Sequence, residues 1–331
     1  MKSHRSSLSR RSFAAGFGAL LASPSVLRAQ GAPFPSRSLS LIVPFVPGGS
    51  TDVIARVVAE AMRGPLGQPV IVENHGGAGG SIGTAAIARA NPDGYTIGMG
   101  TASTLAINPA AYKTLPYDVA RDLSAIGLIA EVPNIMEINA SLPAADMADF
   151  ITLAKSKPGQ LAYGSSGNGS VSHLMGEQFK LSTRTDLLHV PYRGVGPALQ
   201  DAVGGQIQVM FDNLPTSLSL VQAGKLRALA VSSRKRLAVL PDVPTFAELK
   251  LTELDWTAFF GLVAPAKTDP AIVETLNAAL LRALGDATVR ERLAGQQADV
   301  SPGTPAQFGT MVADAGARMR RATQAAHISI E

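Results

Sequence analysis

Short runs rich in β-branched residues alternate with segments of helical periodicity along most of this chain. The run LSLIVPF, for example, precedes a segment in which the apolar residues from Ile54 to Met62 recur every three or four positions, as one buried face of a helix requires. Such alternation is typical of an α/β fold in which helices cover a parallel sheet. The alternation begins again after Pro133, so the sequence predicts two α/β units.

The remaining patterns indicate which segments of the chain belong to each unit. In the second unit, after Pro133, we expect first a helix near 144–155 and then alternating strands and helices. The last part of the chain contains the strand pattern DWTAFFGLVAP and helical patterns near 270–296 and 305–325. We expect this last part to pack back on the first unit, which would make that unit discontinuous.

The first 29 residues have the features of a secretory signal: a basic start, a short apolar stretch and the small residue Ala29 at its end. The arginine pair Arg10 and Arg11, in SRRSFA, favours twin-arginine export, with the Sec pathway as the alternative. The apolar run from Phe13 to Ala22 is shorter than the roughly 20 residues that a membrane span requires. We therefore expect cleavage after Ala29 and a mature protein in the periplasm.

The charge of the chain depends on this segment. Residues 1–29 contain five of the 29 Lys and Arg residues and none of the 25 Asp and Glu residues, so the mature chain is close to neutral. A basic surface for nucleic acid or for an anionic membrane is therefore not expected. The chain has no cysteine, which excludes disulfides and thiol chemistry, and its five histidines lack metal-binding spacing, so we expect no metal and no other cofactor.

Enzyme motifs are scarce. No phosphate-binding GxxxxGK[ST] motif is present, which argues against a nucleotide enzyme. GGSIG matches the GxSxG pattern of hydrolases, with Ser81 as nucleophile and His173 or His189 as base, but seven residues separate this serine from Glu73 at the end of the preceding strand pattern. We interpret the segment as a glycine loop capped by Ser81, and keep a secreted serine hydrolase as the alternative function.

Polar, glycine-rich turns follow several of the expected strands, namely VPGGSTD, NHGGAGGS, GTAST and YGSSGNGSVSH. In an α/β sheet such turns gather at the carboxyl ends of the strands, where ligands bind. Backbone N–H groups at helix starts carry partial positive charge and bind anions without lysine or arginine. The turns therefore predict a site for a small carboxylate, with plain helix capping as the alternative for any single turn.

Three polar residues follow strand patterns in the second unit. Tyr192 and Arg193 follow LLHVP, and the Arg193 guanidinium can pair with both oxygens of a carboxylate. Asp212 can meet an amino group of a ligand or cap the next helix, and we favour the cap.

Beyond these patterns, long blocks of the chain resemble the Bug (TctC-like) family, the substrate-binding receptors of tripartite tricarboxylate transporters. The resemblance rests on LIVPFVPGGSTDVIARVVAEAM, LGQPVIVENHGGAGGSIGTAAIARANPDGYTIGMG, INPAAY, YGSSGNGSVSHLMGEQF, HVPYRGVGPALQDAVGGQIQVMFDNL and GKLRALAVSSRKRLAVLPDVPTFAE. These blocks lie in register over nearly the whole mature chain.

The resemblance implies the type II periplasmic-binding-protein fold, in which two α/β domains joined by a hinge close on a ligand cleft. The first domain would comprise residues 31–132 and 233–331, and the second residues 133–232. It also implies a monomer without catalytic activity, which captures a small organic acid and delivers it to a tripartite tricarboxylate transporter. A sensor that signals instead of feeding a transporter is the remaining alternative. The acid itself is left open: a mono-, di- or tricarboxylate or an amino acid.

The resemblance also implies which residues bind. One ligand carboxylate would lie against the second-domain turn at 164–170, and the other end of the ligand would face the first-domain turn at 45–51, often through bridging waters. The ligand-binding residues carried over by motif match are Phe45, Val46, Gly48, Gly49, Thr51, Ser165, Ser166, Asn168, Gly169 and Ser170, with Tyr192 and Asp212 as further candidates.

Two positions depart from the family pattern. Where many relatives have RPGAGG this chain has NHGGAGG, so that His75 and Gly76 replace an Arg-Pro pair at the rim of the site. Val46 stands where relatives often have proline, at a position that we expect near the distal end of the ligand.

Overall fold

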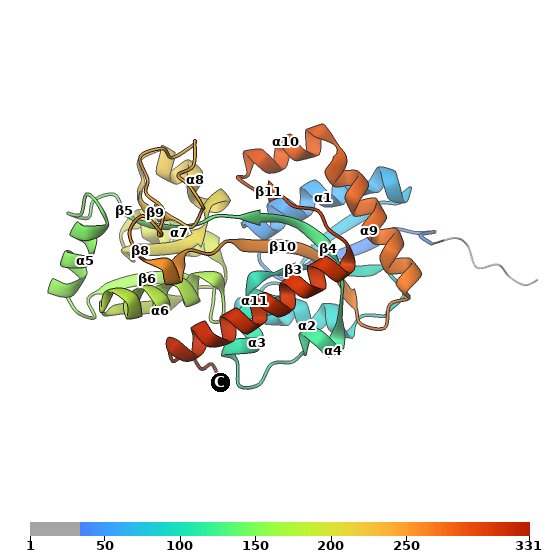
Figure 1. The fold of residues 1–331 in the computed structure, drawn as a ribbon, viewed down its shortest axis with the longest axis horizontal. Coiled ribbons are helices and arrows are strands. Elements are labelled where there is room, and N and C mark those ends of the chain that lie inside the picture. The colour runs from blue at the N-terminus through green and yellow to red at the C-terminus, as the bar shows by residue number, and fades with distance from the viewer. Residues whose placement is uncertain (1–33) are drawn as a thin grey trace, which may run out of the picture. The chain divides into compact units, whose positions relative to one another are not determined.

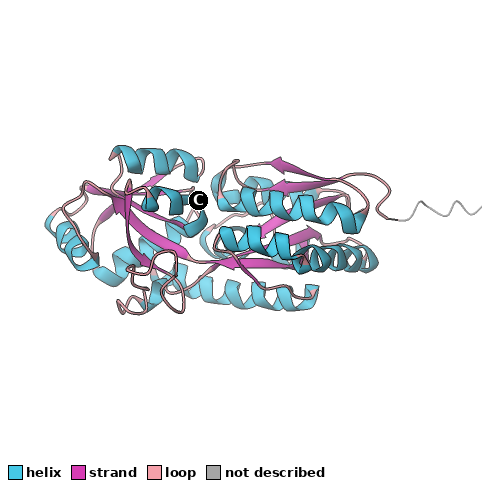
Figure 2. Cartoon of the chain, turned by 90° about the horizontal axis from the view of Figure 1, so that it is seen from above, coloured by secondary structure: helices cyan, strands magenta, loops and turns pink. Residues whose placement is uncertain are grey.

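The structure, a computed structural model, describes residues 34–331, and the predicted export signal with its cleavage site after Ala29 lies outside the described residues. Two β-sheets, each covered by helices, form two lobes that lie side by side (Figures 1 and 2). We call the lobe whose sheet begins at Leu39 the first lobe, and the lobe whose sheet begins at Asn134 the second lobe.

The sheet of the first lobe is built from β1 (Leu39–Val43), β2 (Val70–Asn74), β3 (Thr96–Thr101), β4 (Leu123–Val132), β10 (Ala258–Pro265) and β11 (Asp299–Val300). Their order across the sheet is β11-β4-β10-β3-β1-β2. β1 pairs in parallel with β2 and β3, whereas β10 runs antiparallel to both β3 and β4. The expected parallel sheet is therefore a mixed one, because β10 returns from the second lobe in the opposite direction.

The sheet of the second lobe contains β5 (Asn134–Asn139), β6 (Leu161–Ser165), β7 (Leu187–Pro191), β8 (Val209–Asn213) and β9 (Leu226–Val231), in the order β7-β6-β8-β5-β9. β6 is parallel to β7 and β8, and β5 is antiparallel to β8 and β9. The sequence analysis did not predict β5. This strand is entirely buried, but its asparagines and Glu137 interrupt the apolar run that marks a buried strand.

The helices of the first lobe fill the connections of its sheet. They are α1 (Ser50–Leu66), α2 (Ser81–Arg89), α3 (Asn108–Ala111), α4 (Val119–Asp122), α9 (Pro270–Gly285), α10 (Ala287–Gly295) and α11 (Pro305–Ala325), with short helical turns at η1 (Ala78–Gly80) and η2 (Ser103–Ile107). The single helical stretch expected near 270–296 is two helices, because Asp286 ends α9 and its carboxylate accepts the first N–H groups of α10.

The second lobe carries α5 (Met147–Ser156), α6 (Val171–Thr183), α7 (Val195–Gly204) and α8 (Leu214–Gln222), and a further turn, η3 (Thr252–Leu254), precedes β10. Tyr163, Phe179 and Phe211 form the aromatic centre of this lobe, with Phe211 lying edge-on to Tyr163 at 5.9 Å. In the described part of the chain, no helix is both long and apolar enough to cross a membrane.

The chain passes between the lobes twice, and one buried side chain ties the two passages together. Asn134, which directly follows Pro133, donates through Nδ2 to the carbonyl oxygen of Trp256 at 2.6 Å, and its backbone N–H donates to the Ser232 hydroxyl at 2.7 Å. Asn213 Nδ2 donates to the side-chain oxygen Oδ1 of Asn134 at 2.7 Å. Asn134 therefore links the passage from β4 to β5 with the passage from β9 to β10, and we call this set of contacts the Asn134 clasp.

Replacing Asn134 by alanine is expected to destabilise the protein strongly. The substitution leaves the carbonyl of Trp256 and the amide of Asn213 without their partner, at roughly 1–3 kcal/mol for each buried group. Urea denaturation measures this loss, and Asn91→Ala, at an exposed loop position, is the matched control. Equal stabilities of the two variants would show that the clasp contributes nothing.

Candidate functional site

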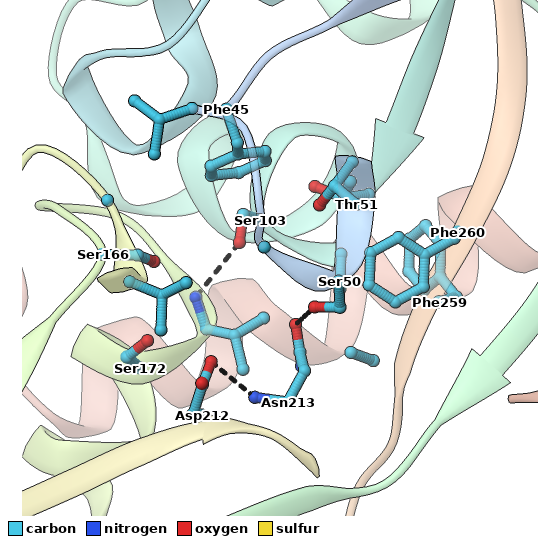
Figure 3. A pocket seen from close by; sticks show the side chains of 18 residues that line it. Phe45, Ser50, Thr51, Ser103, Ser166, Ser172, Asp212, Asn213, Phe259 and Phe260 are labelled. Atoms are coloured by element: carbon cyan, nitrogen blue, oxygen red, sulfur yellow. Dashed lines mark hydrogen bonds between the residues drawn. The ribbon is translucent and has the colours of Figure 1, made fainter. Parts of the chain in front are cut away.

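A partly open cavity of about 40 Å³ lies between the two lobes, where several parallel strands end (Figure 3). The first lobe lines it with Phe45, Val46, Gly49, Ser50, Thr51, Thr101, Ala102, Ser103, Ala258, Phe259 and Phe260. The second lobe lines it with Ser166, Val171, Ser172, Gly194, Val195, Asp212 and Asn213. The volume corresponds to a few water molecules, at roughly 10–15 Å³ each.

Three helices begin at this cavity: α1 at Ser50, α6 at Val171 and α7 at Val195. The first backbone N–H groups of a helix have no partner within the helix and carry partial positive charge. Among residues 34–331, no lysine or arginine lines the cavity, and Asp212 is its only acidic side chain. The positive potential of the cavity therefore comes from the peptide backbone of both lobes, an arrangement suited to an anion.

The loop before α1 is held by a buried carboxylate. Asp52 accepts hydrogen bonds from the Gly48 N–H at 3.0 Å, from Asn74 Nδ2 at 2.9 Å and from Arg56 Nε at 3.0 Å. Burial acts to raise the pKa of Asp52, but the bonds from Arg56, Gly48 and Asn74 outweigh it, so the pKa is lowered and the group stays ionised. Asn74 also donates to the carbonyl of Phe45, which fixes the loop against β2.

The turn between β6 and α6 is held by two stacked histidines. His189 Nε2 and Ser165 Oγ are hydrogen-bonded at 2.7 Å, and His173 Nδ1 accepts the Gly169 N–H at 3.2 Å. The two imidazole rings lie 4.2 Å apart and nearly parallel. Burial lowers the pKa of both histidines, that of His189 to about 3, so both rings are neutral at neutral pH and Nδ1 of His173 remains an acceptor.

Glycine-rich backbone of one lobe lies directly against backbone of the other. At Gly79, with φ of +58°, an added Cβ would come within 2.0 Å of the Asn168 carbonyl oxygen. The Tyr112 hydroxyl lies within 3.2 Å of the carbonyl oxygens of both Ala78 and Asn168. A second close approach joins Gly194 to Val46, where an added Cβ would meet the valine side chain at 2.3 Å. The lobes are therefore closed on each other in this structure.

Hydrogen bonds also cross between the lobes at the cavity. The Val171 N–H, the first of α6, donates to the Ser103 hydroxyl at 3.1 Å, and the Ser50 hydroxyl donates to Asn213 Oδ1 at 3.2 Å (Figure 3). Closure thus gives polar groups at the starts of α1 and α6 a partner in the opposite lobe.

The residues predicted for the site divide into two groups. Six of them line the cavity, namely Phe45, Val46, Gly49, Thr51, Ser166 and Asp212. The other six shape the turns around it, namely Gly48, Ser165, Asn168, Gly169, Ser170 and Tyr192.

The second group is engaged within the protein. Ser170 is the N-cap of α6 and accepts the His173 N–H, and the Tyr192 hydroxyl donates to Asp201 at 2.7 Å. Arg193 is exposed and does not line the cavity.

Asp212 is not the helix cap that we favoured. The cap position of α8 is Asn213, and Asp212 instead lies at the end of β8 with 5% of its surface exposed, facing the cavity. Its Oδ1 accepts the Asn213 N–H at 2.7 Å, and its Oδ2 has no partner. Local sequence does not separate the two roles, because an aspartate at the end of a strand and an aspartate before a helix look alike.

Several lining residues were not predicted. Thr101, Ala102 and Ser103 belong to GTAST, a turn that the sequence analysis noted but from which it selected no residue. Phe259 and Phe260 come from β10, which carried no signal beyond its strand pattern, since only its return into the first sheet brings it to the cavity.

The hydrolase alternative finds no catalytic arrangement in the described residues. Ser81 is buried as the first residue of α2, and Gly80 occupies the cap position. His173 and His189 bond to Gly169 and Ser165 in the other lobe. Within residues 34–331, no group of acidic residues and histidines is arranged to hold a metal ion.

Comparison with known proteins gives the family. Residues 54–328 match the model of the tripartite tricarboxylate transporter family receptor. The chain belongs to this family. Protein BugT of Bordetella pertussis is 39% identical over 282 residues, which cover 85% of this chain and 86% of BugT.

Two solved structures that are similar to this chain contain a small carboxylic acid. R. palustris Rpa4515 with adipate is 35% identical, with a TM-score of 0.86, over 89% of this chain and 99% of that chain. MatC from Rhodopseudomonas palustris with bound malate is 34% identical, with a TM-score of 0.84, over 87% of this chain and 99% of that chain. The two lobes therefore have the periplasmic-binding-protein fold that the resemblance implied.

The buried histidines predict how stability responds to acid. In the unfolded chain a histidine binds a proton below about pH 6.5, whereas folded His189 resists protonation down to a pKa of about 3, so stability is lost as the pH falls through this window. As the pH falls from 6.5 to 4, the unfolding midpoint of His189→Gln should therefore fall less than that of the wild type. Each kcal/mol of stability that the variant keeps corresponds to a difference of roughly 2–4 °C in the midpoint. Thermal unfolding against pH measures this difference, with the exposed His327→Gln as control; parallel curves for all three proteins would contradict it.

Proposed function

We propose that this receptor is a periplasmic binding protein that closes its two lobes around a small carboxylic acid and delivers it to a tripartite tricarboxylate transporter. The observation that carries the proposal is the convergence of three helix N-termini, from both lobes, on a cavity that no basic side chain of the described residues lines. Backbone N–H groups attract an anion in such a place.

The chemistry of the lining supports a carboxylate ligand. Ser103, Ser166 and Ser172 supply short hydroxyl groups around the start of α6, while Phe45 and Phe259 supply apolar surface for a short carbon chain. Adipate and malate, which are bound in two similar solved structures, each have two carboxylates joined by a short carbon chain, as this lining would accommodate.

Within this proposal the predicted site residues have two roles. Phe45, Val46, Gly49, Thr51, Ser166 and Asp212 contact the ligand directly. Gly48, Ser165, Asn168, Gly169, Ser170 and Tyr192 hold the two turns in the conformation that presents their N–H groups. Gly76 adds to the rim, because an added Cβ there would lie 2.9 Å from Val46, so both departures from the family pattern meet at one place.

Ligand exchange requires the lobes to separate, and we propose residues 31–132 with 233–331 as one moving body and residues 133–232 as the other. The Asn134 clasp lies where the two bodies join, and hinge motion about it would open the cavity. The residues around Leu240 are an exception to this division and travel with the second body, since Leu240 packs with Ile135, Leu214 and Val231. A ligand closes the lobes only through contacts that it makes in the closed state.

The location and the absence of chemistry are part of the proposal. Residues 1–29 have the pattern of an export signal, which would place the mature monomer in the periplasm. Binding without catalysis predicts that a serine-reactive fluorophosphonate leaves Ser81 unlabelled.

The first test is thermal unfolding of mature protein, freed of carried-over ligand by unfolding and refolding, with L-malate, succinate, adipate, citrate and L-aspartate. An acid present at 100 times its dissociation constant stabilises the folded state by about 2.7 kcal/mol and raises the unfolding midpoint by several degrees. Acetamide and glycerol serve as uncharged controls. A panel in which no acid raises the midpoint would reject the proposed function.

The closed contact at Gly79 provides a second test. Gly79→Ala places a methyl group against the Asn168 carbonyl oxygen and should abolish the acid-induced midpoint shift by preventing closure. Gly67→Ala is the matched control, because Gly67 has a similar φ of +67° but no atom within 4 Å of an added Cβ. Both variants carry the same backbone strain of about 1–2 kcal/mol. If Gly79→Ala binds as tightly as Gly67→Ala, binding does not depend on this closed contact.

A further inference from the structure

Two carboxyl groups lie together beneath the cavity without a cation. Asp212 on β8 and Glu137 on β5 are on the same face of the second sheet, because Ile135 pairs with Asp212 and Glu137 lies two residues further along β5. Glu137 is fully buried, and neither of its oxygens has a hydrogen-bond partner. The Ser217 hydroxyl lies beside Glu137 and acts to lower the pKa of this carboxyl, but burial outweighs it.

The elements around Asp212 offer no compensating positive charge. β5 contributes Glu137, and α8 contains no titratable residue. α6 contributes neutral His173 and the paired Glu177 and Lys180, and α7 contributes Asp201, which accepts a bond from Tyr192. Asp52 at the start of α1 is engaged by Arg56 and Asn74. An ionised Asp212 would therefore face an anion-binding cavity and a second acid with no cation in contact.

These surroundings favour the protonated acid. Burial raises the pKa of Asp212 to about 8, although the Asn213 N–H and the nearby Thr216 hydroxyl act to lower it. Burial, together with the proximity of Asp212, raises the pKa of Glu137 well above its ordinary value. At neutral pH Asp212 therefore carries a proton, and the ionised form of Glu137 is disfavoured. Asp212 lines the cavity, and its Oδ2 makes no hydrogen bond to any of the described residues.

We propose that Asp212 acts as a neutral carboxylic acid that donates a hydrogen bond from Oδ2 to a carboxylate oxygen of the ligand, and so selects for an ionised acid. The inference rests on the proposed function and specifies what one lining residue does in it. An amide or alcohol ligand of the same shape gains a weaker bond, because the bond from an acid to a carboxylate is charge-assisted. An ammonium group placed at this position would instead require ionised Asp212.

The proposal makes binding depend on pH in a defined direction. Above pH 8 the free protein loses the proton from Asp212, and binding of the ionised ligand must take up one proton from solvent. Affinity should then fall with rising pH, about tenfold between pH 7 and pH 9. The carboxyls of malate, succinate and adipate are ionised throughout this range, so the ligand contributes no such dependence.

The test measures the dissociation constants of L-malate, succinate and adipate at pH 7 and pH 9 for the wild type and for Asp212→Asn. Asparagine keeps an N–H donor at the same place but does not titrate, so this variant should bind equally at both pH values and about tenfold more tightly than the wild type at pH 9. Asp314→Asn, on the exposed side of α11, should behave as the wild type. Calorimetry of the wild type at pH 9 in two buffers of different ionisation enthalpy counts the proton taken up and does not depend on any variant.

The outcomes distinguish a failure of the role of Asp212 from a failure of the proposed function. The role of Asp212 is overturned if the acids bind with an affinity that stays the same or rises from pH 7 to pH 9, and if no proton is taken up. The proposed function would then remain intact. The same role is overturned if Asp212→Asn retains the full pH dependence. If none of the acids binds at either pH, the proposed function fails and this inference fails with it.

Discussion

The site depends on one constraint: helices that belong to two different sheets must begin at the same place. Each strand–turn–helix unit sets its helix N-terminus at the carboxyl end of a parallel strand, so a single sheet collects such ends along one edge. Here α1 comes from one sheet and α6 and α7 from the other, and the Asn134 clasp fixes the passages through which the two edges face each other. Among the described residues, no lysine or arginine lines the cavity. Its positive potential therefore exists only while the strand ends of the two sheets face each other.

The local parts of this arrangement were readable in the sequence, and their assembly was not. The turn before α1 and the turn before α6 were identified from glycine and small polar residues between a strand and a helix pattern. Strand β5 was missed because Asn134 and Glu137 occupy buried positions in it, and a polar residue in a strand normally indicates an exposed face. The same two residues are buried for reasons that only the tertiary structure supplies: one joins the passages between lobes, and the other lies beside Asp212.

Ser103 and Ser165 illustrate the same limit at the scale of single side chains. Both are serines in polar turns at strand ends, and composition treats them alike. In the structure the Ser103 hydroxyl accepts the first N–H of α6 from the opposite lobe, whereas the Ser165 hydroxyl turns inward to His189. The difference follows from which side of the cavity each turn occupies, a property of the pair of lobes and not of either turn.

The contacts between lobes also bear on how such a receptor distinguishes acids by size. At Gly79 and Asn168 backbone lies on backbone, and neither partner has a flexible side chain that can adjust to a wider gap. An acid too long for the cavity holds the lobes apart, and a separation of even 1 Å stretches the bond from Val171 to Ser103 and the Tyr112 contact with Asn168 beyond hydrogen-bond range. A ligand that fits poorly therefore loses the stabilisation from contacts between the lobes, which do not involve the ligand itself. Since those contacts form only at full closure, selection by length follows from the rigidity of the glycine-rich turns, even where the lining of the cavity is compatible with many carboxylates.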